Sequence, residues 1–221
     1  MSLMDNNKYI TIAIDGAAGS GKSTTSNLLC KKYKYIHVDT GLHYRSLAFY
    51  LQKLNISSGC AAAFITSNKI LLDSSLCNYS VCLNIDGTVF NAQELRNEDM
   101  NKMVSYYARI PELRSLLLQY QRNLPSFGKS NGFDGIVMDG RDIGSIVLPN
   151  ADLKFFLHAN LNVRENRRSN DGEIDSISSR DKLDSTRRIA PLTCPSDAVP
   201  INTGDLSPEE VINFISSHIS Q

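Results

Sequence analysis

Residues 16–23 read Gly16-Ala17-Ala18-Gly19-Ser20-Gly21-Lys22-Ser23, which is a glycine, four residues, and then glycine, lysine and serine. This is a complete phosphate-binding loop signature, in which glycines let backbone N–H groups wrap a chain of phosphates. Lys22 can reach the β- and γ-phosphates, and the Ser23 hydroxyl can bind Mg²⁺. We therefore expect the loop, together with Thr24, to bind the phosphates of a nucleotide, and Ser23 to bind the metal.

The residues on either side of the loop have the character that the motif requires. Residues 9–14 form a short apolar run typical of a strand, and residues 23–33 are predicted to form a helix. The amino terminus of this helix would add its partial positive charge to the anion site. A glycine-rich turn that matched by chance would lack these flanks, so strand, loop and helix together predict nucleotide binding.

The composition excludes several classes of function. The 221 residues are enough for one α/β domain with insertions. Lys and Arg number 23, as do Asp and Glu, and the resulting net charge of zero argues against a large nucleic-acid-binding surface. No apolar run is long enough for a membrane span, and residues 1–8 lack the apolar region of a signal peptide. We expect a cytoplasmic protein that binds neither nucleic acid nor membranes.

The cysteines and histidines give no metal-site signal. The five cysteines are odd in number, and only Cys77 and Cys82 lie close together, with no second Cys or His pair at zinc-site spacing. We expect all five to be free thiols in a reducing compartment. The four histidines also lack metal-site spacing and are expected to be structural or exposed.

Five apolar runs predict a parallel sheet. Each run is short and is followed by polar or glycine-bearing residues, which is typical of buried parallel strands. The runs are residues 10–14, 35–38, 135–138, 153–157 and 198–201. The predicted fold class is α/β, a P-loop NTPase fold with a central five-stranded parallel sheet flanked by helices. The final helix is the clearest, with Ser207 as its cap and Pro208 at its first position.

Two longer segments interrupt the alternation of strands and helices. Residues 42–131 are too many for one crossover helix, and we expect an inserted substrate-binding subdomain with a hairpin of residues 79–85 and 88–90 across Asp86-Gly87. Residues 160–188 carry six arginines among several acids and are expected to form a short lid. The core of this single unit would comprise residues 8–41, 132–159 and 189–221.

A phosphate-binding loop alone is shared by ATPases, GTPases and kinases. A GTPase needs Asn-Lys-x-Asp to read guanine, and the nearest match, residues 68–71, lacks the aspartate. Phosphoryl transfer needs arginines that spread the transition-state charge. Because ligands bind beyond the carboxyl ends of parallel strands, arginines that follow successive strands should converge there. These arginines are Arg45, Arg141, Arg180, Arg187 and Arg188.

Five segments carry a resemblance to a known family. They are residues 12–16 with the loop, 39–45, 110–114, 138–144 and 180–192. On these segments, which occur in the family's order and span most of the chain, the sequence resembles the long, bacterial type of cytidylate kinase. The patterns Asp-Gly-Arg-Asp-x-Gly and Arg-Asp-x-x-Asp-x-x-Arg are much more specific than the loop.

The resemblance implies an acceptor site for a nucleoside monophosphate. Arg45 and Arg114 would hold its phosphate, a dianion that suits paired guanidinium groups. Thr40, Ser105 and Asp142 would line the cytosine. A carboxylate or hydroxyl that accepts from the exocyclic amine would prefer cytosine over uracil, because the wrong base leaves buried groups unpaired.

The resemblance also implies residues close to the transferred group. Arg141 and Arg180 would lie near the transferred phosphoryl group. Asp184 and Arg187 would help to hold the nucleotide, with Arg187 also close to the phosphate. Together with Lys22, the three arginines would form the catalytic set.

The reaction implied is transfer of the γ-phosphoryl group from ATP, with Mg²⁺, to CMP or dCMP, giving ADP and CDP or dCDP. Catalysis would rest on positioning and charge stabilisation without a covalent intermediate, in a monomer. Two alternatives stay open. One is a kinase for UMP or another small acceptor, and the other is a nucleotide-binding regulatory module without turnover.

Overall fold

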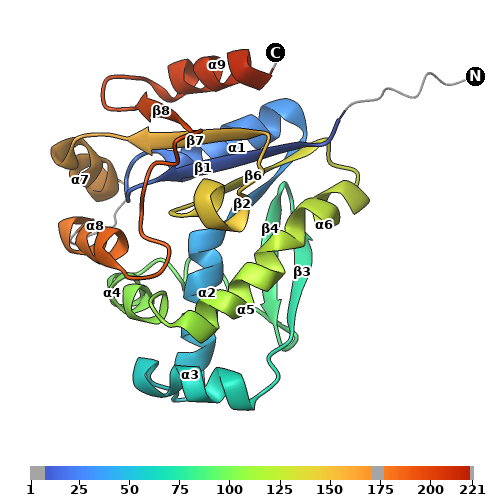
Figure 1. The fold of residues 1–221 in the computed structure, drawn as a ribbon, viewed down its shortest axis with the longest axis vertical. Coiled ribbons are helices and arrows are strands. Elements are labelled where there is room, and N and C mark those ends of the chain that lie inside the picture. The colour runs from blue at the N-terminus through green and yellow to red at the C-terminus, as the bar shows by residue number, and fades with distance from the viewer. Residues whose placement is uncertain (1–7, 171–176, 220–221) are drawn as a thin grey trace, which may run out of the picture.

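The computed structural model describes residues 8–170 and 177–219, apart from the side chains of Glu98 and Arg180. All five predicted strands form, and they are parallel in the order β2-β6-β1-β7-β8 (Figure 1). They are β1 (Ile10–Gly16), β2 (Tyr35–Asp39), β6 (Gly135–Gly140), β7 (Leu153–His158) and β8 (Val199–Asn202). The predicted fold class is therefore confirmed.

A hairpin of three further strands extends this sheet. They are β3 (Leu72–Cys77), β4 (Ser80–Ile85) and β5 (Thr88–Val89). The predicted antiparallel pair forms as β4 and β5, whereas β3 was not predicted. Because β4 also pairs in parallel with β2, where the His37 N–H donates to the Tyr79 carbonyl at 2.7 Å, the hairpin becomes part of an eight-stranded sheet.

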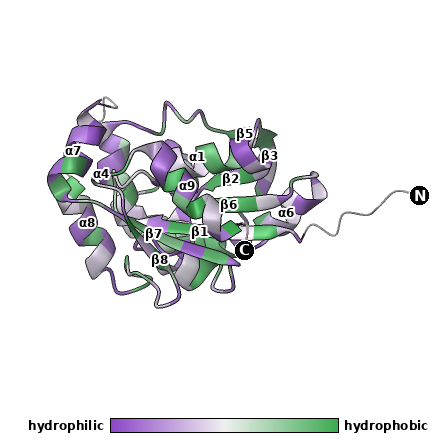
Figure 2. Ribbon diagram, turned by 90° about the horizontal axis from the view of Figure 1, so that it is seen from above, coloured by the Kyte–Doolittle hydropathy of each residue, from purple (hydrophilic) through white to green (hydrophobic). Residues whose placement is uncertain are grey.

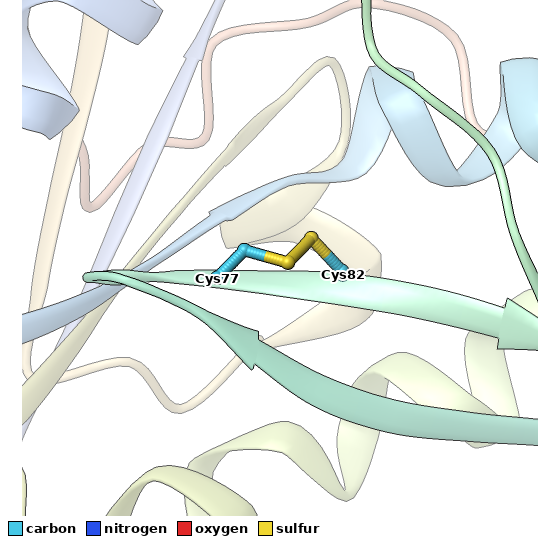
Figure 3. The surroundings of a disulfide bond; sticks show 2 residues. All are labelled: Cys77 and Cys82. Atoms are coloured by element: carbon cyan, nitrogen blue, oxygen red, sulfur yellow. A yellow bond between two sulfur atoms is a disulfide. The ribbon is translucent and has the colours of Figure 1, made fainter.

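The expectation of five free thiols is wrong for Cys77 and Cys82. These two cysteines form a disulfide bond with their Cα atoms 6.0 Å apart (Figure 3). The two-residue turn at Asn78 and Tyr79 folds β3 back onto β4, which brings both cysteines to adjacent strands. Because β3 was not predicted, this contact could not be foreseen from the spacing. The remaining cysteines are free, with Cys30 buried and Cys60 and Cys194 exposed.

Helices cover both faces of the sheet. They are α1 (Lys22–Tyr33), α2 (Thr40–Lys53), α3 (Ser58–Ser67), α4 (Glu98–Tyr107), α5 (Pro111–Arg122), α6 (Leu124–Ser130), α7 (Leu161–Asn170), α8 (Ile177–Thr186), α9 (Pro208–Ile219) and the short π-helix η1 (Ile143–Val147). Alternate residues of β1 face opposite cores: Ile12 and Ile14 pack with α1 and α9, and Ala13 packs with α2 and α5. The sheet is thus the middle of three layers.

The final helix begins where the sequence predicted. The Ser207 N–H donates to the Glu210 carboxylate at 2.8 Å, and the Glu210 N–H donates back to Ser207 Oγ at 3.3 Å. This reciprocal capping box satisfies donors that the first turn leaves unpaired.

Polar helices gather at one end of the molecule. In Figure 2 the central strands β2 and β6 are mostly hydrophobic in colour, whereas α7 and α8 carry many hydrophilic residues. These two helices lie at the end where the parallel strands terminate (Figure 1). Across the part of the chain that the structure describes, none of the helices has both the length and the apolar character that crossing a membrane requires.

Candidate active site

The phosphate-binding loop joins the carboxyl end of β1 to α1, as predicted. Gly19 and Gly21 adopt φ values of 71° and 90°, which favour glycine. A Cβ atom on Gly16 would lie 2.1 Å from the Leu157 carbonyl oxygen, and one on Gly19 would lie 2.7 Å from the Arg164 carbonyl oxygen. These glycines therefore allow β7 and α7 to approach the loop closely.

Lys22 lies in the first turn of α1 and curls back over the loop. Its Nζ donates to the Ala17 carbonyl at 2.8 Å, and the residue is only 8% exposed. Burial, and secondly the charge of Arg141, lower the pKa of Lys22 to about 7. An anion bound in the loop would offset this effect, because an opposite charge favours the ammonium form. The geometry suits Lys22 to a phosphate ligand.

A cavity of about 530 Å³ extends from the loop along the carboxyl ends of the strands. This volume is typical of a small-molecule site. The predicted residues that line it are Ala18, Gly19, Gly21, Lys22, Ser23, Thr24, Thr40, Arg45, Ser105, Arg141, Asp142, Asp184 and Arg187. Four other predicted residues do not line the cavity: Gly16, Ala17 and Ser20, which lie in the loop, and Arg114, which is buried against Asp142. The side chain of Arg180 lies outside the described residues.

Asp142 connects two buried arginines at the base of the cavity. Arg114 Nη2 donates to Asp142 Oδ2 at 2.5 Å, and Arg187 Nη2 donates to Asp142 Oδ1 at 3.2 Å. Arg114 also lies over the ring of Tyr44, with Cζ 5.3 Å from the ring centroid. The carboxylate of Asp142 is thus held in one orientation by two charge-assisted hydrogen bonds.

Arg45 and Arg114, which the resemblance assigns to the acceptor phosphate, have different partners in this structure. Arg45 donates through Nε and Nη2 to Asn101 Oδ1 at 3.3 and 3.0 Å and reaches the cavity wall. Arg114 is directed to Asp142, and its Nη1 donates to the Ala108 carbonyl at 3.2 Å. Arg45 alone of these two guanidinium groups lines the cavity.

Arg141 bridges the phosphate-binding loop and α8. Its Nη1 donates to the Gly16 carbonyl at 3.0 Å, and its Nε donates to Asp184 Oδ2 at 2.8 Å. Arg187 Nη1 lies 3.9 Å from Asp184 Oδ1. The predicted pair of Asp184 and Arg187 is therefore brought together with Arg141, beside the loop.

The sequence reasoning missed one end of the cavity. This end is lined by residues of the β8–α9 connection and the start of α9, together with Arg167 of α7; they are Thr203, Leu206, Pro208 and Val211. Arg167 donates to Thr203 Oγ1 and O at 3.1 and 2.5 Å, and Thr203 Oγ1 donates to the Ser20 carbonyl at 3.0 Å. The sequence signal for this end of the cavity was the polar run 202–204 after the fifth predicted strand. This run carries no charged group that would have marked it as part of a site.

A family model described as cytidylate kinase matches residues 12–221. The chain belongs to the cytidylate kinase family. A cytidylate kinase of Lactiplantibacillus plantarum is 37% identical, over 96% of this chain and 95% of the relative. One from Caldanaerobacter subterraneus subsp. tengcongensis is 38% identical, over 95% and 94%. Among solved structures, a gluconokinase from Sinorhizobium meliloti has a TM-score of 0.50 at 12% identity, covering 96% of this chain and 91% of that one, which supports the fold alone.

The oxygen groups of this cytidylate kinase suit a magnesium ion held jointly with phosphates. Ser23, Asp39 and Asp139 line the same cavity. Within residues 8–170 and 177–219, no group of three or more His, Cys, Asp or Glu side chains is placed to hold a metal by itself. Mg²⁺ commonly takes most of its ligands from water and substrate phosphates, so this donor set fits it.

Asp39 has two partners at the start of α2. Its Oδ1 accepts from the Leu42 N–H at 3.1 Å, which caps the helix, and its Oδ2 pairs with Arg96 Nη2 at 2.9 Å. The sequence left open whether Asp39 caps a helix or helps to hold Mg²⁺ through water. The structure shows the cap, while the position on the cavity wall is compatible with both roles.

Asp139 is supported from behind by His37. His37 Nε2 lies 2.8 Å from Asp139 Oδ2, and both residues are buried. Burial lowers the pKa of His37, but the hydrogen bond and the charge of Asp139 more than offset it, so that the pKa is raised overall.

We expect this pair to make the cytidylate kinase less stable as the pH rises. Because the folded-state pKa of His37 is raised, its stabilisation is fully present below the unfolded-state value of about 6.5 and is lost as the pH passes the folded-state value. The difference in unfolding free energy between wild type and His37→Gln should therefore be largest below about pH 6 and shrink as the pH rises. Urea unfolding at several pH values measures this, and a pH-independent difference would contradict it.

Proposed function

We propose that this protein transfers the γ-phosphoryl group of ATP to CMP or dCMP. The observation that carries the proposal is the cavity itself, which has the phosphate-binding loop at its centre and a different wall on each side. In the strand order, β2 and β6 flank β1 on one side, and β7 and β8 on the other. The cavity therefore has room for a donor and an acceptor that meet at Lys22.

The β8 side is the proposed donor end. The loop holds the phosphates of ATP through its backbone N–H groups and Lys22. Leu206, Pro208 and Val211 offer an apolar surface in the cavity, and Arg167, which donates to Thr203, lines the same end. A flat aromatic base suits such a surface, because aromatic rings stack on apolar groups and on guanidinium planes.

The β2 and β6 side is the proposed acceptor end. Arg45 binds the phosphate of the monophosphate, since it is a guanidinium on the cavity wall. Thr40, Ser105 and Asp142 contact the base, with Arg114 holding Asp142 from behind. A carboxylate fixed in this way accepts from the exocyclic amine of cytosine, whereas uracil presents a carbonyl there and is rejected.

The transfer itself needs charge stabilisation more than covalent chemistry. A phosphate oxygen of CMP forms a bond to the γ-phosphorus as the bond to the β–γ bridging oxygen breaks. Lys22, Arg141 and Arg187 supply positive charge around the moving group, together with Arg180 by family resemblance. When bound, Mg²⁺ adds charge between the phosphates, with Ser23 as its protein ligand.

The segments around the cavity have proposed roles as well. Residues 42–131 form the acceptor-binding insert. Of the lid segment 160–188, residues 171–176 lie outside the described residues; residues 160–170 and 177–188 are proposed to exclude water and so suppress ATP hydrolysis. The lid contacts the loop directly: Arg164 Nη1 donates to the Ala18 carbonyl at 3.0 Å and to Asp181 at 2.5 Å. We further propose that the enzyme is a cytoplasmic monomer without nucleic-acid or membrane partners. Its zero net charge supports the absence of a nucleic-acid partner.

The test is an assay of ADP release with ATP, Mg²⁺ and one acceptor at a time. CMP and dCMP should support turnover, while UMP should be poorer by about two orders of magnitude or more, since a mismatched buried hydrogen bond discriminates strongly. A preference for UMP or AMP would identify a different acceptor. Binding of an ATP analogue without turnover on any acceptor would instead indicate a regulatory module.

A further inference from the structure

Asp15 is a buried carboxylate immediately before the phosphate-binding loop. It is 2% exposed and does not line the cavity. Its Oδ1 accepts from the Ile143 N–H at 2.7 Å, and its Oδ2 accepts from the Gly144 N–H at 2.7 Å. These two amides directly follow Asp142, so Asp15 holds the backbone that carries the proposed cytosine-reading carboxylate.

A second contact runs in the opposite direction. Arg141, which precedes Asp142, donates through Nη1 to the carbonyl of Gly16, the residue after Asp15. Three hydrogen bonds therefore join residues 15–16 to residues 141–144. Because the pairing of β1 with β6 ends at Asp15 and Gly140, these bonds continue the connection beyond the sheet.

Only an acceptor-only group fits this position. The two N–H groups belong to successive residues, and each carboxylate oxygen takes one of them. An asparagine would keep one acceptor oxygen but place an NH₂ group against the other N–H. Gly144 permits the approach, because a Cβ atom there would lie 3.3 Å from Asp15 Oδ2 and 3.1 Å from Lys154 Cδ.

Keeping the Asp15 carboxylate ionised at this depth costs desolvation free energy. Burial raises the pKa of Asp15 to about 6, although the two amides, and the charge of Lys22, act to lower it. The nearby charge of Asp142 raises the pKa further. The carboxylate carries this cost because it supplies acceptors for two buried amides, which an apolar side chain would leave unpaired.

We propose that Asp15 is a positioning residue that fixes the segment 139–144 against the phosphate-binding loop. By holding Ile143 and Gly144, it sets where Asp142 meets the acceptor base and where Arg141 meets the transferred group. The connection couples the donor and acceptor halves of the site without touching either substrate. The inference rests on the proposed function, because it assigns Asp142 to the acceptor and the loop to ATP.

The experiment compares Asp15→Asn with Asp152→Asn in the full-length protein. Asp152 is the control. Like Asp15 it accepts a backbone N–H, in this case from Thr11 of β1 at 2.9 Å, but it lies at the end of the strand away from the loop. For Asp15→Asn we expect kcat/KM for CMP to fall about 10- to 100-fold, the effect of losing hydrogen bonds to a charged group. The dissociation constant of a non-hydrolysable ATP analogue should stay within about threefold, because the loop and its lysine are intact.

Four outcomes are decisive. Retained analogue binding shows that Asp15→Asn is folded, so a selective loss in the CMP reaction supports the positioning role. We expect Asp152→Asn to leave kcat/KM for CMP unchanged. The same result for Asp15→Asn would overturn the positioning role. An equal loss of CMP turnover and analogue affinity with a lowered melting temperature would also overturn it, by showing a merely structural role. If the wild type itself shows no CMP-dependent ADP release, the proposed function fails instead.

Discussion

Replacement of Lys22 by methionine should lower kcat for CMP phosphorylation by about three orders of magnitude or more, the scale of removing a charge that stabilises phosphoryl transfer. Methionine keeps the apolar stem and removes only the ammonium group. That group is buried and has its pKa lowered to about 7, so it already carries a desolvation cost in the fold. The variant should therefore melt at the same temperature as the wild type or higher. A coupled assay of ADP release and a thermal melt measure the two effects.

Lys154 provides a matched control for this prediction. Like Lys22 it is 8% exposed, but its Nζ donates to the Pro149 carbonyl and to Asp197, away from the cavity. Lys154→Met should therefore lose stability and keep its turnover. If Lys22→Met retained more than about a tenth of wild-type kcat, the proposed charge stabilisation by Lys22 would be wrong.

The strands that could be predicted from the sequence are those with a recognisable local pattern of apolar residues. Each of the five parallel strands is an apolar run that ends in polar or glycine residues, and the central strand β6 is buried on both faces. Strand β3 has no such pattern: Leu76 is exposed, and Ser74 and Ser75 stand where a buried strand would have apolar residues. Its structure depends on pairing with β4, and this tertiary contact leaves little local signal.

The functional site likewise has a part that could be predicted from the sequence and a part that could not. The loop could be predicted because all its functional atoms come from one contiguous segment. The partners of the arginines could not, because the pairs Arg45 with Asn101 and Arg114 with Asp142 join segments that only the fold brings together. At the β8 end, Leu206 and Val211 are apolar residues near a strand, a pattern that equally fits a core, so sequence alone does not place them on a cavity wall.

Replacement of Arg187 by alanine should raise KM for CMP by about 100-fold and lower kcat, because Arg187 is proposed to act on both CMP and the transferred group, with little change in ATP affinity. Arg187 is buried and donates to Asp142 and to the Ala190 carbonyl, so its loss leaves a buried carboxylate with one fewer partner and a carbonyl without its donor. Asp142 lies at the acceptor end, whereas the loop contacts of Lys22 and Gly16 remain. Initial rates over a range of CMP concentrations, with calorimetric binding of an ATP analogue, measure the two affinities.

Arg122 serves as the control for Arg187. It lies on α5 and donates to the carbonyls of Ile146 and Val147 at 2.8 and 3.3 Å, outside the cavity. Arg122→Ala removes a guanidinium from backbone acceptors without touching either substrate site, so KM for CMP should stay within about twofold of wild type. A loss of CMP and ATP binding by the same factor in Arg187→Ala would contradict its assignment to the acceptor end. In that case the arginine would serve the fold around Asp142 rather than the recognition of CMP.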